Sequence, residues 1–117
     1  MKKIGIIGRG AIGSEIASFI NKYLKTKARL VALCDIDSKK VSALSKRIRS
    51  HPSVTDIDSL IKKSDLVIEA AGVKIAGKAA KKAILHGKDV LVMSTGGLLQ
   101  NKSLFKKAKV KGSNIYI

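Results

Sequence analysis

Short apolar runs alternate with segments of helical period along the whole chain, and this alternation limits the fold more than any other feature. The short runs are nearly continuous in their apolar character, which is typical of strands buried on both faces. Between them, apolar side chains recur every three or four residues, as in amphipathic helices. Strands and helices that alternate in this way form parallel sheets covered on both faces and joined by right-handed crossovers. We therefore predict an α/β fold with a doubly wound parallel sheet in three layers.

The expected elements fill one domain over residues 1–117, a length typical of a single domain. We expect strands at 3–7, 30–34, 53–55, 65–70, 89–93 and 114–117. We expect helices at 12–24, 38–50 and 74–86, a brief one that Asp58 caps, and a last one from Asn101 or Ser103. Apolar residues recur at helical spacing in the first helix at Ile12, Ile16, Phe19, Ile20 and Tyr23.

The first expected strand continues directly into a glycine-rich turn that opens the first helix, Gly8-Arg9-Gly10-Ala11-Ile12-Gly13. Glycine-rich turns also occur simply because a chain bends sharply, but a buried strand before and a helix after favour a dinucleotide site. Gly8 would permit the tight turn, Gly10 the approach of a pyrophosphate, and Gly13 close packing of helix on strand. The helix N-terminus would add free N–H groups and a partial positive charge. This pattern predicts a Rossmann-type domain.

An acidic residue stands where such a domain binds the adenine ribose. Asp35 directly follows the second expected strand, 22 residues after Gly13, close to the usual interval of about 20. Its carboxylate would accept hydrogen bonds from ribose hydroxyls and repel a 2′-phosphate, which favours NAD; Ile36 would lie beside it. Asp37 is a rival for the ribose. NADP is the alternative, because three cations could reach a 2′-phosphate: Arg9, Lys39 and Lys40.

Small residues follow two later strands, at Ala70-Ala71-Gly72 and at Ser94-Thr95-Gly96. Ligands of doubly wound sheets lie outside the carboxyl ends of the strands. We therefore expect the nicotinamide half of the cofactor to lie across these two segments, with hydroxyls offered by Ser94 and Thr95. The alternative is that both are ordinary turns.

Four stretches of the sequence together resemble the L-aspartate dehydrogenases of archaea and bacteria: 3–13, 65–71, 87–96 and 115–117. The resemblance covers the full chain and implies a reversible NAD(P)-dependent reaction between L-aspartate and iminoaspartate, or oxaloacetate plus ammonia, on a route toward NAD biosynthesis. Homoserine dehydrogenase, which shares this architecture, is a close variant. Gly72 and Gly97 depart from the serine and alanine that the family often carries there.

The same resemblance implies a further domain, because members of the family continue beyond the position of Ile117. That domain carries the substrate pocket, the catalytic histidine and much of the oligomer interface. We expect this C-terminal domain to be absent from residues 1–117, which would then bind cofactor without turning over aspartate. The surface left uncovered could drive self-association, which predicts a homodimer.

Other chemistry-bearing residues predict no catalytic or metal site. His86 at a helix end and His51 in a loop are expected to be structural or surface residues. Cys34 ends an apolar strand and is expected to be a packed thiol. No histidine or cysteine pair has the spacing of metal ligands. Glu69 could face the cofactor or be a satisfied polar residue.

Charge is the unusual feature of the composition. Lys and Arg number 24 against 8 acidic residues, a net charge of +16. A nucleic-acid partner would explain this, and the alternative function is a stand-alone dinucleotide-binding or redox-sensing module whose basic surface contacts nucleic acid. We favour solvated lysine faces, because the lysines are spread along the chain and aromatic residues make up only 3%.

A single cysteine favours the cytoplasm, and no apolar stretch approaches the roughly 18 residues of a membrane span.

Overall fold

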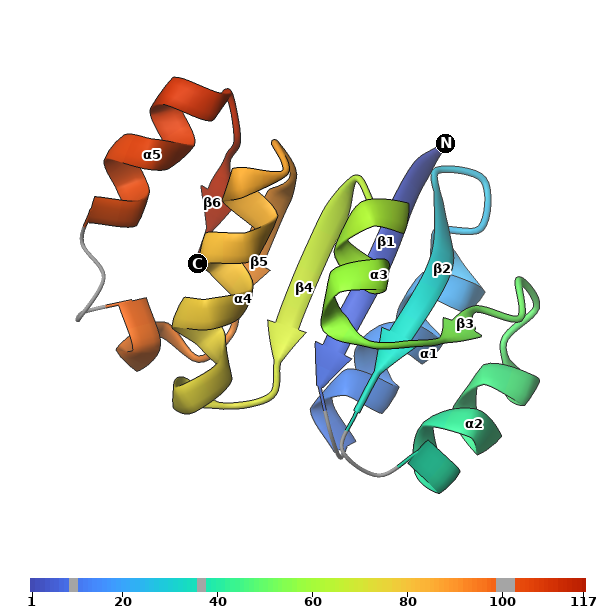
Figure 1. The fold of residues 1–117 in the computed structure, drawn as a ribbon. Helices are drawn as coiled ribbons and strands as arrows, with labels where there is room; N and C mark the ends of the chain where they lie inside the picture. The colour runs from blue at the N-terminus through green and yellow to red at the C-terminus, as the bar shows by residue number, and fades with distance from the viewer. Residues whose placement is uncertain (9–10, 36–37, 99–102) are drawn as a thin grey trace.

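The computed structural model describes residues 1–8, 11–35, 38–98 and 103–117, and these form one parallel sheet between helices (Figure 1). The sheet has six strands in the order β3-β2-β1-β4-β5-β6, and every adjacent pair is parallel. The chain therefore builds outward from β1 on one side and then returns to build on the other, which confirms the doubly wound fold. The strands are β1 Lys2–Gly8, β2 Ala28–Cys34, β3 Ser53–Val54, β4 Leu66–Ala70, β5 Asp89–Val92 and β6 Ile115–Tyr116.

Five α-helices and a short 3-10 helix connect the described strands and cover both faces of the sheet. Buried residues of α1 and α2 pack on one face of β1, β2 and β4, whereas those of α3, α4 and α5 pack on the other. No helix of the described residues has the length and apolar character needed to cross a bilayer. The helices are α1 Ala11–Tyr23, α2 Ser38–Arg47, α3 Ile57–Lys63, α4 Val73–Leu85, η1 Thr95–Leu98 and α5 Ser103–Lys111.

The apolar residues predicted along α1 divide between two sides of the helix. Ile16 and Ile20 pack toward the sheet together with Ala17. Ile12, Phe19 and Tyr23 are instead 57%, 54% and 62% exposed. The helix itself is therefore confirmed, but only part of its predicted apolar set is buried.

The cap of α3 also differs from the prediction. Asp56, not Asp58, is the N-cap residue, and its Oδ1 accepts a hydrogen bond from the Ser59 N–H at 2.8 Å. The carboxylate of Asp58 instead forms an exposed ion pair with Lys82 Nζ at 2.9 Å. The N-cap hydrogen bonds hold the pKa of Asp56 below its usual value.

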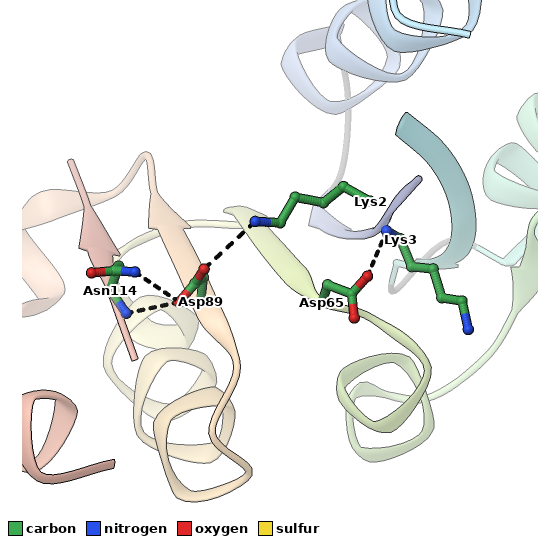
Figure 2. A network of polar contacts seen from close by, with 5 residues as sticks. All are labelled: Lys2, Lys3, Asp65, Asp89 and Asn114. Atoms are coloured by element: carbon green, nitrogen blue, oxygen red, sulfur yellow. Dashed lines mark hydrogen bonds and ion pairs between the residues drawn. The ribbon is translucent and has the colours of Figure 1, made fainter. Parts of the chain in front are cut away.

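Polar contacts at the amino ends of the strands join the two halves of the sheet (Figure 2). Asp65 Oδ2 accepts the Lys3 N–H at 2.8 Å, which ties β4 to β1. Asp89 Oδ1 accepts the Asn114 N–H at 2.8 Å, and Asp89 Oδ2 lies 3.8 Å from Lys2 Nζ. Asp65, just before β4, and Asp89, the first residue of β5, thus fix the edge of the sheet that lies opposite the predicted site.

Candidate cofactor-binding site

The register of the sheet brings the predicted segments to one edge. Gly8 at the end of β1 pairs with Ala70 at the end of β4, and Glu69 pairs with Val92 near the end of β5. On the other side of β1, Ile7 pairs with Cys34, the residue before Asp35. The glycine-rich turn, Asp35, and the segments after β4 and β5 therefore all begin at the carboxyl ends of four adjacent strands. This is the topological switch point, where ligands of doubly wound sheets bind.

The glycine-rich turn is confined on its β4 side. A Cβ atom added at Gly8 would lie 3.0 Å from the Cβ of Ala70 and 3.2 Å from its carbonyl carbon, closer than such atoms normally approach. A Cβ added at Gly13 would have no heavy atom nearer than 3.8 Å, an ordinary contact. The expected need for glycine in close packing therefore applies at Gly8 and not at Gly13. Arg9 and Gly10 lie outside the described residues.

A cleft of about 390 Å³ opens beside this turn, between α1 and α2. Asp35 lines the cleft, and its Oδ1 is buried without a hydrogen-bond partner among the described residues. A buried carboxylate oxygen that no protein group satisfies is costly, and a ligand hydroxyl group would satisfy it. The acid predicted to hold the ribose therefore lines a cleft and has an acceptor oxygen that no described residue satisfies. The cleft is lined by Ile6, Gly8, Gly13, Ser14, Leu33, Asp35, Lys40, Val41, Ala43, Leu44 and Arg47.

Two cations share the cleft with Asp35. Lys40 is one of the cations that the sequence places near a 2′-phosphate. Arg47 is not among them, although it lies seven residues further along α2 and so on the same helical face. A search of that face at helical spacing would have found it. Lys39 is exposed and does not line the cleft. Ile36 and Asp37 lie outside the described residues.

Glu69 is a buried residue whose carboxylate oxygens are satisfied by hydrogen bonds from the two segments at the site. It is completely buried, and its Oε1 accepts the N–H groups of Ala71 at 3.1 Å and Gly72 at 3.2 Å. Its Oε2 accepts the Ser94 N–H at 3.2 Å. One carboxylate therefore joins the segments after β4 and β5. Gly72, the N-cap of α4, has a φ of 123°, a conformation that favours glycine.

The remaining segment residues lie at the same edge. Gly96 is exposed, and a Cβ added there would be 3.5 Å from the side chain of Val73 at the start of α4. Ile12 is exposed on the first turns of α1. The backbones of Ala11 and Thr95 lie at the starts of α1 and η1.

The histidines and the cysteine lie where the sequence placed them. His86 is the C-cap of α4, and its Nδ1 lies 2.9 Å from the Lys82 carbonyl oxygen. His51 lies exposed between α2 and β3. Burial raises the pKa of the Cys34 thiol, and the negative charges of Asp56 and Asp35 raise it further. The described residues contain no group of three or more His, Cys, Asp or Glu side chains able to hold a metal ion.

The fold and this edge of the sheet define a dinucleotide-binding domain of the doubly wound class. The profile of a family described as "Homoserine dehydrogenase, NAD binding domain" matches residues 8–117, and the chain belongs to that family. It is an NAD(P)-binding domain. The matched residues include the glycine-rich turn, Asp35 and the ends of β4 and β5.

Curated relatives of this chain include several L-aspartate dehydrogenases. The chain is 38% identical to the L-aspartate dehydrogenase of Methanocaldococcus jannaschii over 121 aligned residues, which cover 100% of this chain and 45% of that protein. It is 36% identical to that of Methanosarcina barkeri, with 99% of this chain and 44% of the relative covered. The chain thus spans less than half the length of these relatives.

Solved structures with the same fold include dehydrogenases and a reductase. Biliverdin reductase from Synechocystis, solved with biliverdin and NADP⁺, superposes with a TM-score of 0.85 at 21% identity, covering 97% of this chain and 36% of that one. A homoserine dehydrogenase from Thiobacillus denitrificans gives 0.84 at 20% identity, covering 99% and 29%. At these identities the similarity establishes the fold.

Proposed function

We propose that residues 1–117 form the cofactor domain of an L-aspartate-dehydrogenase-like oxidoreductase and hold the adenosine half of NAD in the cleft beside Asp35. The observation that carries this proposal is the buried Oδ1 of Asp35, which lacks a partner among the described residues and lines a cavity next to the glycine-rich turn. A ribose hydroxyl would donate a hydrogen bond to this oxygen, and a hydrogen bond to a charged group stabilises a complex by about 1.5–3 kcal/mol.

The rest of the cofactor would follow the edge of the sheet. The turn from Gly8 to Gly13 and the N–H groups at the start of α1 would bind the pyrophosphate. The nicotinamide half would lie over the segments after β4 and β5, where small residues leave room. The proposed contacts are Gly8, Arg9, Gly10, Ala11, Ile12, Gly13, Asp35, Ile36, Ala70, Ala71, Gly72, Ser94, Thr95 and Gly96.

We propose NAD as the preferred cofactor. The carboxylate of Asp35 would repel a 2′-phosphate, since both are negative. Lys40 and Arg47 in the same cleft would attract that phosphate and offset part of this repulsion. NADP would therefore still bind, but more weakly than NAD. Replacement of Asp35 should therefore weaken NAD binding far more than NADP binding.

In the complete enzyme, bound NAD would accept a hydride from L-aspartate. The names of the relatives support this substrate, because those at 38% and 36% identity are L-aspartate dehydrogenases. We propose that a second domain supplies the substrate pocket and the proton-transferring group, as relatives are more than twice as long as the matched region. A homodimer, a cytoplasmic location and the less favoured nucleic-acid contact stay predictions from the sequence.

The test is titration of the chain with NADH and with NADPH, followed by nicotinamide fluorescence, for wild type, Asp35→Ala and Asp58→Ala. Asp58 is a matched control, because it is an exposed carboxylate on α3 that pairs with Lys82 outside the cleft. Asp35→Ala should weaken NADH binding about 10- to 100-fold, the loss of one hydrogen bond to a charged group, and should weaken NADPH binding less. Equal losses for both cofactors, or no loss, would refute the role of Asp35.

A further inference from the structure

Glu69 has an environment unlike that of any other charged residue in the described part of the chain. Its side chain is completely buried, and it is the single charged residue among the buried ones there. It lies at the penultimate position of β4, one residue before the segment Ala70–Gly72. Burial of a carboxylate is costly unless hydrogen bonds compensate, so its partners explain why it is tolerated.

The two oxygens of Glu69 divide their partners between two segments. Oε1 accepts the N–H groups of Ala71 and Gly72, in the connection from β4 to α4. Oε2 accepts the Ser94 N–H, which follows β5. The backbone carbonyl of Glu69 also accepts the Met93 N–H at 3.0 Å. Each segment is thereby held to the same side chain, and their separation is fixed by its geometry.

This arrangement requires a carboxylate rather than a polar side chain of the same shape. A carboxylate accepts hydrogen bonds at both oxygens, whereas the amide of glutamine accepts at one atom and donates at the other. With glutamine at position 69, an NH₂ group would face either the Ser94 N–H or those of Ala71 and Gly72. One of the two segments would lose its anchor and move away.

We propose that Glu69 is a positioning residue that sets the surface on which the nicotinamide ring lies, an inference that rests on the proposed placement of the nicotinamide half over these two segments. The adenosine half would bind in the cleft beside Asp35, between α1 and α2, whose lining residues do not include any of the three segment residues that Glu69 holds. Loss of the Glu69 anchor should therefore disturb the nicotinamide half and leave the adenosine half in place.

The test compares binding of NADH with that of ADP-ribose, which lacks the nicotinamide, for wild type and Glu69→Gln. We expect NADH to bind about tenfold more weakly to the variant, a change of about 1.4 kcal/mol, with altered fluorescence of the bound nicotinamide. ADP-ribose should bind within about twofold of wild type. A parallel loss for both ligands would indicate a merely structural role and overturn the inference, as would an unchanged ratio.

Asp65→Asn is the matched control, because Asp65 also accepts a backbone N–H from a neighbouring strand but lies at the opposite end of β4 (Figure 2). It should leave the ratio of the two affinities unchanged. If Glu69→Gln does not fold, backbone NMR of the wild type decides: the amide signals of Ala71, Gly72 and Ser94 should shift on addition of NADH and stay in place with ADP-ribose. Amide signals of these three residues that do not shift on addition of NADH would overturn the inference. Failure of the wild type to bind either compound would refute the cofactor site itself.

Discussion

Gly8 and Gly13 of the glycine-rich turn differ in how closely other atoms approach them, so the same substitution to alanine should have opposite effects on stability at the two positions. In Gly8→Ala, the new methyl group would stand 3.0 Å from the Cβ of Ala70 and 3.2 Å from its backbone carbonyl. Because the obstacle includes backbone of β4, the strands must separate by a few tenths of an ångström. Overpacking of this kind costs about 1–3 kcal/mol.

Gly13→Ala meets nothing nearer than 3.8 Å and lies within α1. Alanine in a helix is more stable than glycine by about 0.5–1 kcal/mol. For a domain of this length, 1 kcal/mol moves the Tm by about 4 °C. Gly8→Ala should therefore lower the Tm by about 4–12 °C, and Gly13→Ala should raise it by about 2–4 °C.

Thermal unfolding followed by circular dichroism measures both changes in the same buffer, without cofactor. The wild type and the two variants should give cooperative transitions in the order Gly13→Ala, wild type, Gly8→Ala from highest to lowest Tm. A Gly13→Ala variant that is destabilised as much as Gly8→Ala would refute the reasoning, because it would mean that helix and strand approach closely at both glycines.

Two ionisable groups give further predictions. Iodoacetamide at pH 8 should modify Cys34 more slowly in the folded chain than in urea, because burial and the charges of Asp56 and Asp35 raise its pKa; equal rates would contradict this. Hydrogen bonds at the α3 N-terminus lower the pKa of Asp56, so its contribution to stability is present above the unfolded pKa of about 4 and is lost as pH falls through the lower folded value. Asp56→Ala should thus lower the Tm at pH 7, with a gap from wild type that closes toward pH 2; a gap independent of pH would count against this cap.

The fold was accessible from the sequence because its signals are local and repeated. The central strands are short and mostly apolar, and Val41 and Leu44 occupy the predicted inner face of α2, while Ile48, which follows the helix, is buried in the same cluster. The stop of α4 at Gly87 was also predicted, and the glycine has a φ of 69° there. Parallel pairing then follows from alternation alone.

The orientation of α1 was accessible only in part. Apolar residues occur on more than one side of this helix: Ile16 and Ile20 pack toward the sheet, whereas Ile12, Phe19 and Tyr23 are exposed. Helical spacing predicts that the helix is amphipathic but does not say which of its apolar residues the sheet covers.

The sequence indicates which segments meet at the candidate site but not the contacts between them. Asp35 stands out in the sequence because its interval from the glycine-rich turn is characteristic, and the structure places it in the lining of the cleft. The hydrogen bonds of Glu69 join its own connection to α4 with Ser94, which lies 25 residues further along the chain, and such a pairing becomes visible only when β4 and β5 lie side by side. Arg47 does not stand out in the sequence because it lies about two helical turns after Lys40, a cation of α2 expected near a 2′-phosphate.

The central claim, that the adenosine half of the cofactor binds beside Asp35, is tested most directly by calorimetric titration of the wild type and of Asp35→Ala with ADP-ribose. This ligand contains the adenine ribose, whose hydroxyl would donate a hydrogen bond to the Oδ1 of Asp35, an atom without a partner among the described residues, and it contains no nicotinamide. The account predicts binding to the wild type with one site per chain and an affinity for Asp35→Ala about 10- to 100-fold lower. Equal affinities for the two proteins would contradict it.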